Sequence, residues 1–471
     1  MSVAITVLYL LTFVIIALWA VQKIIENKSI SLYPMFLLAI DVLYLLIPAI
    51  LFMFGAYDRQ ASDLVAVIYT SSNRRRISTY FIVLLCVVIV SLLQELRIKK
   101  WSRKTPLLCA PQDPSQVRDI TYRVCQKWFW VMWGVGMLFT LVMMLKIGPH
   151  GFILYSGSAR GEGSLPIESG SLFAYAVNFS RALIASLVPG ILMHEIKPSV
   201  KMKCILGVTL VFSLLLLIFN AGKTNFIIFL VPLAVYCISK WCKFKVRYLV
   251  LAGVLAGILA IFLVPLLDNL FYLISTGESV GKYRDSWNVI NYLVSIARQF
   301  AYPYSNMILR EQMTALYGYR FFVDYAAVII NLFPAALFGG FEIKTLYHVT
   351  TEYYQTVLSH RGGMPNDYLF FSYRQLGVAG VAIIGALTGA AIRALDRLLF
   401  LVKDAFALIR INGAHFFVSF SLASVVFILI EPLSVLTSFP MVVAAVLMMI
   451  HLSLRLGRAS RVSPCESPEA E

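Results

Sequence analysis

The run VAITVLYLLTFVIIALWAV, Val3–Val21, decides the fold class of this chain. It carries no charge, and as a helix that rises about 1.5 Å per residue it is long enough to cross about 30 Å of hydrocarbon. It lacks the basic start and the small-residue cleavage site of a signal peptide, so we expect a helix that is retained. Further runs of this kind follow, which predicts an all-α polytopic membrane protein.

The composition of the whole chain supports this class. Its 471 residues are 60% hydrophobic and only 14% charged, and the mean hydropathy is +0.81. Soluble globular proteins have about 25% charged residues, so this class is excluded. The net charge is +16, but this does not imply nucleic acid as a partner, because the cytoplasmic loops of membrane proteins collect Lys and Arg.

Apolar runs of spanning length recur along the chain and predict about eleven transmembrane helices in one membrane domain, residues 1–471. Each run is predominantly apolar and is separated from the next by polar or basic residues. The runs are 3–22, 34–54, 77–94, 128–146, 172–193, 204–221, 225–241, 248–267, 375–393, 414–431 and 437–454.

Basic segments between these runs predict which side of the membrane each one faces. One alternating assignment places five of them together in the cytoplasm: 97–127, 197–203, 240–247, 393–410 and the tail 455–471. The N-terminus and the long segment 268–374, between the eighth and ninth spans, then lie outside. The triplet Arg74-Arg75-Arg76 also falls outside, against the charge bias. An unrecognised helix before residue 77, which would return the N-terminus to the cytoplasm, therefore stays open.

The outer segment 268–374 differs from the rest of the chain, because it is rich in aromatic residues with interleaved cations and acids. Arg side chains form paired hydrogen bonds with phosphate oxygens, and aromatic rings suit a sugar face or a membrane boundary. A site for a sugar carried on a phosphate and an ordinary interfacial belt are both compatible with this composition. Within the segment, 325–338 is apolar but too short to span and is broken by Pro334, so we expect a re-entrant or interfacial helix.

Two short outer turns carry cations that could meet an anion. Tyr155–Gly163 combines glycines, which let backbone N–H groups approach an anion, with the fork of Arg160. An ordinary turn with one solvated charge is the alternative. Asn220–Thr224 contains Gly-Lys-Thr but lacks the earlier glycine of a nucleotide-binding loop, so it offers only Lys223 in a tight turn.

Chemistry on the cytoplasmic side is disfavoured. The cytoplasmic segments contain no Asp-x-Asp pair for a nucleotide-sugar metal and no dinucleotide fingerprint. On the outer side, His348 and Glu352 stand four residues apart and would share one face of a helix. Such a pair is either a proton acceptor with its partner or a structural contact.

Four separated groups of residues combine cations, aromatic residues and glycines in a definite order. They are Arg160-Gly161-Glu162, Gly222-Lys223-Thr224, Tyr319-Arg320 with Asn331-Leu332-Phe333-Pro334, and Pro365 with Tyr373-Arg374-Gln375-Leu376-Gly377-Val378-Ala379-Gly380. In order and spacing over roughly 150–395 they resemble the bacterial oligosaccharide repeat-unit polymerases of the O-antigen polymerase family. Lys223 departs from the Arg that members often carry, which keeps the charge but loses the bidentate fork.

This resemblance implies a GT-C-like glycosyltransferase of the bacterial inner membrane that uses no cofactor and no metal. Its substrates would be oligosaccharides on undecaprenyl pyrophosphate, with membrane lipids around it and a chain-length regulator protein as a further partner. An acceptor hydroxyl would attack the anomeric carbon of the donor's first sugar, and the lipid pyrophosphate would leave. Cations would stabilise the charge that grows on the leaving group, and a base would assist the hydroxyl.

The resemblance and the charges together nominate twelve site residues. For pyrophosphate binding they are Arg160, Lys223, Arg284, Arg298, Arg320 and Arg361; for the catalytic base, His348, Glu352, His360 and Asp367; for sugar binding, Tyr319 and Tyr373.

Two other functions remain open from the sequence. An O-antigen ligase would share the fold and the donor but deliver the glycan to a lipid A core. A lipid-linked oligosaccharide flippase would carry charged residues through the middle of its spans, where Asp41 and Arg181 are nearly alone in this chain. The sequence favours the polymerase over both.

Overall fold

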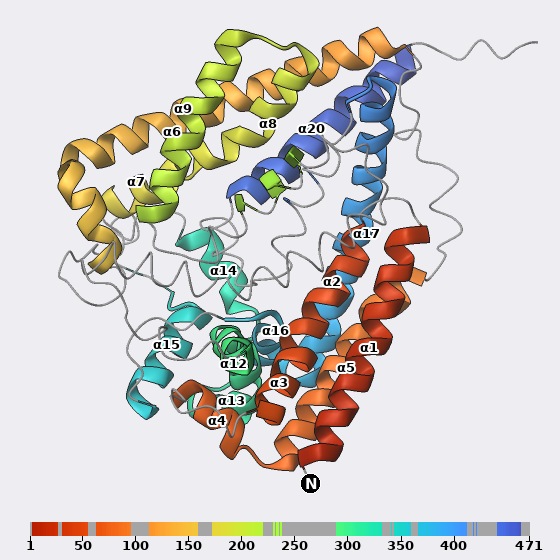
Figure 1. Ribbon diagram of the computed structural model, residues 1–471, viewed down its shortest axis with the longest axis vertical. Coiled ribbons are helices and arrows are strands. Elements are labelled where there is room, and N and C mark those ends of the chain that lie inside the picture. Colours follow the sequence, from red (N-terminus) through yellow and green to blue (C-terminus); the bar gives the residue numbers. More distant parts are fainter. Residues whose placement is uncertain are drawn as a thin grey trace, which may run out of the picture.

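The computed structural model is helical throughout the residues that it describes, and none of these residues forms a strand (Figure 1). The described residues are 2–26, 31–54, 63–95, 113–158, 172–219, 289–331, 343–358, 366–411 and 440–462, with a few positions in 229–237 and at 341, 418 and 421.

Eight helical segments of the described chain are long and apolar enough to cross a membrane, which confirms the multi-pass class. They coincide with eight of the expected runs. The helices are α1 (Ser2–Glu26), α2, η1 and α3 (Leu32–Asp41, Val42–Leu46, Ile47–Phe54), α5 (Asn73–Glu95), α6 (Pro114–Ser158), α7 with α8 (Leu172–Ser180, Ala182–Ile196), α9 (Val200–Phe219), α17 (Val378–Leu408) and α20 (Pro440–Val462). The other three expected spans, 225–241, 248–267 and 414–431, fall almost wholly outside the described residues.

The spans pack in two groups that α17 joins. One group contains α1, α2, α3 and α5, in the lower half of Figure 1, and the other contains α6, α8, α9 and α20, in the upper half. α17 packs along α5 in the first group and against α20 in the second. This long helix therefore connects the two halves of the described membrane region.

α5 and α17 lie close together at one end because α17 presents glycines to α5. A Cβ at Gly389 would stand 3.1 Å from Leu93 Cδ1, and Gly385 lies one turn earlier on the same face. Small residues four apart allow two helix backbones to approach. At this end Gln94 Nε2 donates to the Gly389 carbonyl at 2.7 Å, and Arg393 donates to the Leu93 carbonyl at 2.9 Å. The pair is thus both packed and hydrogen-bonded here.

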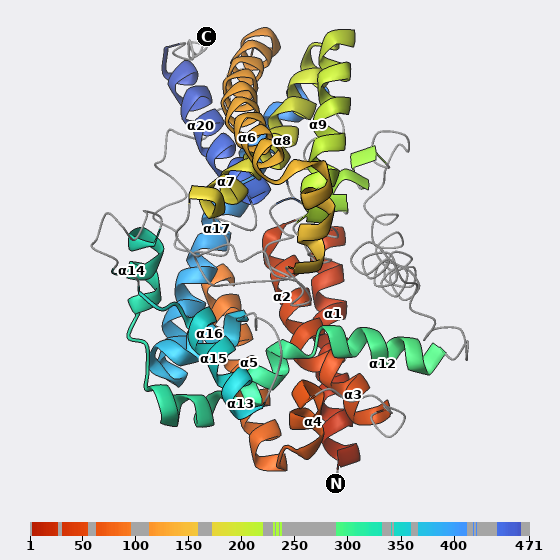
Figure 2. The same ribbon diagram turned by 90° about the vertical axis from the view of Figure 1, so that its left-hand side faces the viewer.

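Shorter helices from the segment 268–374 lie mostly in the half of the molecule that holds the N-terminus (Figure 1). They are α12 (Val289–Gln299), α13 (Tyr302–Tyr317), α14 (Val323–Ile330), α15 (Leu346–Val357) and α16 (Tyr368–Leu376). α13 packs on α4 (Asp63–Thr70) and α12 on α3, and Figures 1 and 2 show both near the N-terminus. Within the expected interfacial helix 325–338, α14 covers the first residues, and 332–340 lie outside the described part.

The Arg74-Arg75-Arg76 triplet stands at the start of α5, beside these shorter helices. Arg76 is buried, and its Nη2 donates to the carbonyls of Ile68 and Tyr69, both at 3.0 Å. These carbonyls end α4 and have no partner inside their own helix, so the cation caps them. With eight residues, α4 is too short to span, and in the described stretch 63–95 no additional span precedes α5.

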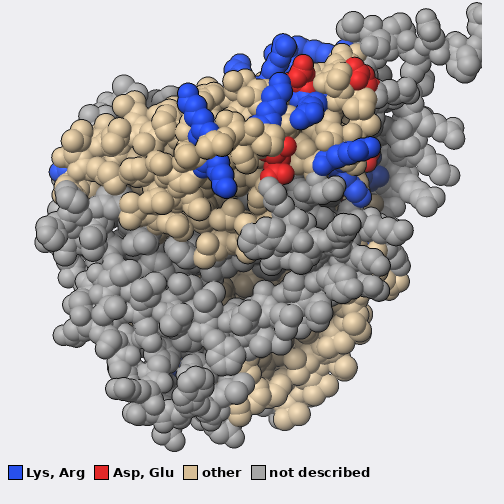
Figure 3. Space-filling view, turned by 45° about the horizontal axis from the view of Figure 1, so that its top comes forward, with Lys and Arg blue, Asp and Glu red and all other residues tan. Residues whose placement is uncertain are grey.

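The opposite end of the molecule carries a basic face. Figure 3 shows Lys and Arg gathered there over α6, α9 and α20. Its exposed members include Arg118, Arg123, Lys127, Lys197, Lys201, Lys203, Arg455 and Arg458. Three of the five basic segments assigned to the cytoplasm thus meet on one face, and the side of the membrane that this face occupies stays a prediction.

Candidate functional site

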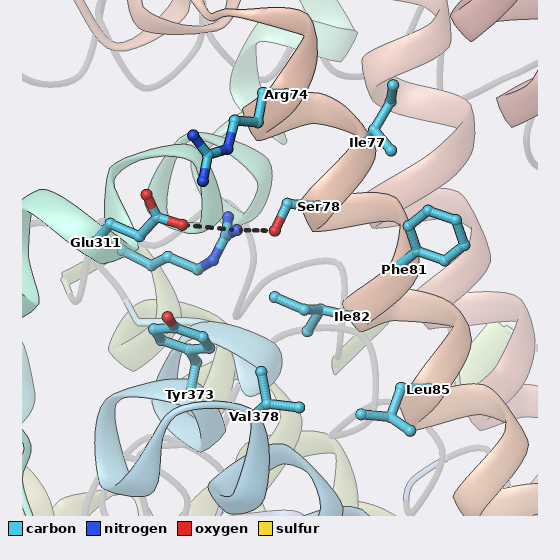
Figure 4. A pocket seen from close by; sticks show the side chains of 10 residues that line it. Arg74, Ile77, Ser78, Phe81, Ile82, Leu85, Glu311, Tyr373 and Val378 are labelled. Carbon is cyan, nitrogen blue, oxygen red and sulfur yellow. Dashed lines mark hydrogen bonds and ion pairs between the residues drawn. The ribbon is translucent and has the colours of Figure 1, made fainter.

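A pocket of about 810 Å³ opens between α5, α13 and the junction of α16 with α17. It lies beside α5 and α17 near the N-terminal ends of both helices, before the close contact at Gly389. Its lining residues are Arg74, Ile77, Ser78, Phe81, Ile82 and Leu85 of α5, Arg310 and Glu311 of α13, Tyr373 of α16 and Val378 of α17 (Figure 4). One end of the pocket is therefore charged and the other is apolar.

The apolar end opens to the outside of the helix bundle. Ile77, Phe81 and Val378 are large apolar residues with exposed side chains, and Phe81 is 62% exposed. On membrane-spanning helices, exposed apolar side chains face lipid. A hydrocarbon chain can therefore reach the pocket sideways, from the bilayer, between α5 and α17.

The charged end is built around Arg310, which is only 1% exposed. Its Nη1 donates to Thr79 Oγ1 at 2.8 Å and to the Met307 carbonyl, and its Nη2 donates to Ser78 Oγ at 2.6 Å. These neutral acceptors orient the guanidinium but do not balance its charge. Among the described residues its one carboxylate contact is Glu311, at 3.5 Å. Burying a cation with so little negative charge beside it costs free energy. An anion bound at the pocket would lower this cost.

Arg74 and Glu311 complete the charged end. Figure 4 shows the Arg74 guanidinium and the Glu311 carboxylate directed toward the space beside Arg310. Both side chains are exposed, unlike that of Arg310. Two guanidinium forks match the oxygens of a diphosphate, and a carboxylate next to them can accept a proton.

The two tyrosines expected to bind sugar lie close to one another, and one of them, Tyr373, lines this pocket. The Arg310 guanidinium carbon stands 5.3 Å from the centre of the Tyr373 ring. Burial raises the pKa of the Tyr373 hydroxyl, the Arg310 cation opposes the change, and the nearby Tyr319 adds to it. Tyr319 lies over Gly377, whose φ of 65° and missing side chain leave room for the ring.

Asp367 lies outside the pocket, in a buried polar cluster. As the N-cap of α16 it accepts from the Phe370 amide at 3.0 Å, and it also accepts from Asn306 Nδ2 at 3.0 Å and from the Tyr44 hydroxyl. Asn306 in turn accepts from Tyr354 at 2.9 Å. Burial raises the pKa of Asp367 to about 6, although its hydrogen bonds oppose this. Through these contacts Asp367 links the start of α16 to α13 and to η1.

Tyr44 reaches Asp367 from inside the second span. It stands in η1, a π-helical turn, and π-helical turns often occur where a helix must aim a side chain at a special site. Its hydroxyl also accepts from the Leu369 amide at 3.2 Å. The second span is therefore tied to the first turn of α16.

Arg320 is committed to a different contact. Its Nε and Nη2 lie 3.2 and 2.8 Å from the two oxygens of the buried Asp324, which also accepts from the Leu346 amide at 2.8 Å and from Gln375 Nε2 at 2.9 Å. Phe322, between the two partners, has a left-handed backbone with φ of 63°. Arg320 thus fastens α14 to the start of α15 and the end of α16, and it does not line the pocket.

The other nominated residues do not gather at the pocket. His348 and Glu352 lie on one helix, α15, as expected, where His348 Nδ1 is 3.0 Å from Thr345 Oγ1 and Glu352 is 3.3 Å from Lys344 Nζ. Arg298 is partly buried near the end of α12 and does not line the pocket. The remaining nominated residues lie outside the described part of the chain: Arg160, Lys223, Arg284, His360 and Arg361.

The three charged residues of the pocket were not among those expected from the sequence: Arg74, Arg310 and Glu311. A signal for two of them was present. Asn306 and Arg310 stand four residues apart, which puts two polar side chains on one face of a helix. Arg74 belongs to the triplet whose position opposed the charge bias, and it lines the pocket at the start of α5.

Comparison with known proteins adds no relative. No protein-family model, no curated protein and no solved structure matches this chain.

Proposed function

We propose that this protein is a membrane glycosyltransferase that polymerises lipid-linked oligosaccharide repeat units. It transfers a growing glycan from undecaprenyl pyrophosphate to the sugar of another lipid-linked unit, on the outer face of the bacterial inner membrane. The observation that carries the proposal is the two-sided pocket, in which the buried Arg310 stands opposite a wall open to lipid. A polyprenyl diphosphate has the same two parts, an anionic head and an apolar tail.

The charged end suits the leaving group of this reaction. When the bond from the anomeric carbon to the diphosphate breaks, negative charge grows on the diphosphate oxygen. Arg310 is already oriented by Ser78 and Thr79, so it would meet this charge without reorganising. Arg74 adds a second fork from the exposed side. The ring of Tyr373, held beside Arg310, offers a face to the first sugar.

The gap between α5 and α17 suits the lipid. The helices are joined at Gly389 and part toward Val378, which leaves the apolar wall of the pocket beside the hydrocarbon. A substrate that never leaves the membrane would slide in sideways and bring its diphosphate to Arg310. A ligase would use the same donor, and the experiment below separates the two functions by their products.

The test is to delete the gene and display the surface glycan of the host by size. Loss of a polymerase leaves acceptors that carry one repeat unit with no ladder above it. A ligase null leaves bare acceptors and long chains on the lipid carrier, and a flippase null leaves bare acceptors and single units inside the cell. Either of these patterns, or an unchanged ladder, would refute the proposal.

Complementation then assigns the site. Wild-type protein should restore the ladder, and Arg310→Lys should restore about 1% of the polymer or less, because loss of one charge-stabilising fork lowers such rates by about 10² to 10³. Arg123→Lys, at an exposed arginine of the opposite basic face, is the matched control and should restore the full ladder. A normal ladder from Arg310→Lys would remove this residue from the reaction.

A further inference from the structure

Glu311 occupies a distinctive place in the pocket. Among the described residues that line it, Glu311 is the one carboxylate, and none of them is a histidine. Consecutive residues of a helix point about 100° apart. Arg310 therefore turns into the protein and is 1% exposed, whereas the Glu311 side chain is 58% exposed and faces the opening.

Of the other candidates for a proton acceptor, His360 lies outside the described residues, and the remaining three have contacts away from the pocket. Asp367 is buried and accepts from three donors, Glu352 pairs with Lys344, and His348 contacts Thr345. None of these lines the pocket. A proton that must be removed from a hydroxyl inside the pocket has one carboxylate acceptor among the described lining residues, Glu311.

We infer that Glu311 is the general base of the glycosyl transfer, an inference that rests on the proposed function. The acceptor's hydroxyl gives its proton to a Glu311 carboxylate oxygen while the hydroxyl oxygen forms a bond to the anomeric carbon. The bond from that carbon to the diphosphate oxygen breaks, and its electron pair leaves with the lipid diphosphate. Arg310 and Arg74 stabilise the anion, and Glu311 later releases the proton to water.

The position of Glu311 next to Arg310 fits these two roles, a base for the acceptor and a cation for the leaving group. The leaving oxygen and the attacking hydroxyl lie on opposite sides of the reacting carbon, a few ångströms apart. Arg310 and Glu311 are adjacent residues of α13, one buried and one facing the opening, and in this structure Glu311 Oε1 lies 3.5 Å from Arg310 Nη2. Ser78, Thr79 and Tyr373 keep the cation in place, whereas the exposed Glu311 side chain can turn from this contact toward the second substrate when a diphosphate occupies the charged end.

The experiment uses full-length protein in phospholipid vesicles. Turnover is measured with lipid-linked oligosaccharide extracted from the host's own membranes, and binding is measured separately with undecaprenyl pyrophosphate alone. The variants are Glu311→Gln and Glu311→Asp. Asp119→Asn is the matched control, because this carboxylate is 60% exposed and lies 3.4 Å from Lys197 Nζ on the opposite face.

A general base contributes about 10² to 10⁴ to the rate, so Glu311→Gln should lower kcat at least about 100-fold while undecaprenyl pyrophosphate still binds and the melting temperature is unchanged. Glu311→Asp should keep intermediate activity, and Asp119→Asn should match wild type.

Two outcomes would overturn the assignment: a kcat of Glu311→Gln within about twofold of wild type, or loss of lipid binding together with activity. Failure of the proposed function looks different. In that case wild-type protein itself neither binds undecaprenyl pyrophosphate nor extends the glycan, whatever stands at position 311.

Discussion

The Arg310 guanidinium lies over the ring of Tyr373, with its central carbon 5.3 Å from the ring centre. This contact joins α13 to α16, and a second contact joins the same helices, since Asn306 donates to Asp367 at the start of α16. Asn306 and Arg310 are one turn apart on α13, a rise of about 6 Å. The charged end of the pocket and the buried polar cluster therefore rest on one pair of helices.

The contact predicts different results for two changes of Tyr373. Tyr373→Phe keeps a ring under the cation and should leave stability nearly unchanged. Tyr373→Leu removes the ring and should destabilise the protein by about 0.5–2 kcal/mol, the range of a cation–π contact from exposed to desolvated sites. Thermal unfolding in detergent measures both. Equal losses from Phe and Leu would show that the hydroxyl, not the ring face, carries the contact.

The polar cluster predicts a pH dependence of stability. The pKa of Asp367 is raised from 3.8 to about 6 in the folded protein, chiefly by burial. A carboxyl group with a raised folded-state pKa stabilises the fold fully below its unfolded value and loses this contribution as pH rises through about 6. At 1.4 kcal/mol per pH unit, the rise corresponds to at most about 3 kcal/mol. The melting temperature should therefore increase as pH is lowered from 7.5 to 5.

Two variants check that Asp367 is the source. Asp367→Asn cannot titrate, so the pH dependence between 5 and 7.5 should become shallower. Tyr44→Phe removes a donor to the carboxylate, which raises the pKa of Asp367 further, so the same rise in melting temperature should begin at higher pH. An unchanged slope in Asp367→Asn would assign the effect to another group.

The spans could be predicted from the sequence because hydropathy is a local property. Each run such as 77–94 contains within itself the information that it crosses the membrane, and eight of the runs are found as helices of spanning length. The helical pair His348 and Glu352 was likewise readable from its spacing, and both residues lie on α15.

The pocket could not be predicted in this way, because its parts come from distant segments. Arg310 is oriented by Ser78 and Thr79, more than two hundred residues earlier, and no local pattern announces that contact. Arg320 is the opposite case, because its partner is close in the sequence. Asp324 stands four residues after it, close enough in sequence for an ion pair, and the structure contains that pair, although Arg320 precedes α14 and the backbone between the partners is left-handed at Phe322.

The Arg320–Asp324 pair predicts a strong coupling. Asp324→Ala should destabilise the protein by about 3–5 kcal/mol, because it leaves the guanidinium without its partner in a mostly buried place. The double variant with Arg320→Ala should be less destabilised than the sum of the two single variants. Lys344→Ala, which removes an exposed ion pair, is the control and should change stability by at most about 1 kcal/mol. Additive losses would mean that Arg320 faces another partner, as a phosphate-binding role requires.

The last prediction concerns the closed end of the α5–α17 gap. In Gly389→Ala the new Cβ would stand 3.1 Å from Leu93 Cδ1 and 3.4 Å from the Val90 Cα, so the Leu93 side chain or one of the two helices must shift by a few tenths of an ångström. Overpacking of this kind costs about 1–3 kcal/mol. Gly207→Ala is the matched control, since nothing lies within 4 Å of its new Cβ and alanine in a helix is favoured by about 0.5–1 kcal/mol.

Displacement of α5 would also reach the pocket, because Ser78 and Thr79 of this helix orient Arg310. Gly389→Ala should therefore lower both the melting temperature and the binding of undecaprenyl pyrophosphate, whereas Gly207→Ala should raise the first slightly and leave the second alone. A Gly389→Ala protein as stable as wild type would show that α5 and α17 are not held by this contact. A destabilised protein with normal binding would show instead that the pocket keeps its shape when the closed end opens, since Arg310 would then still be held by Tyr373.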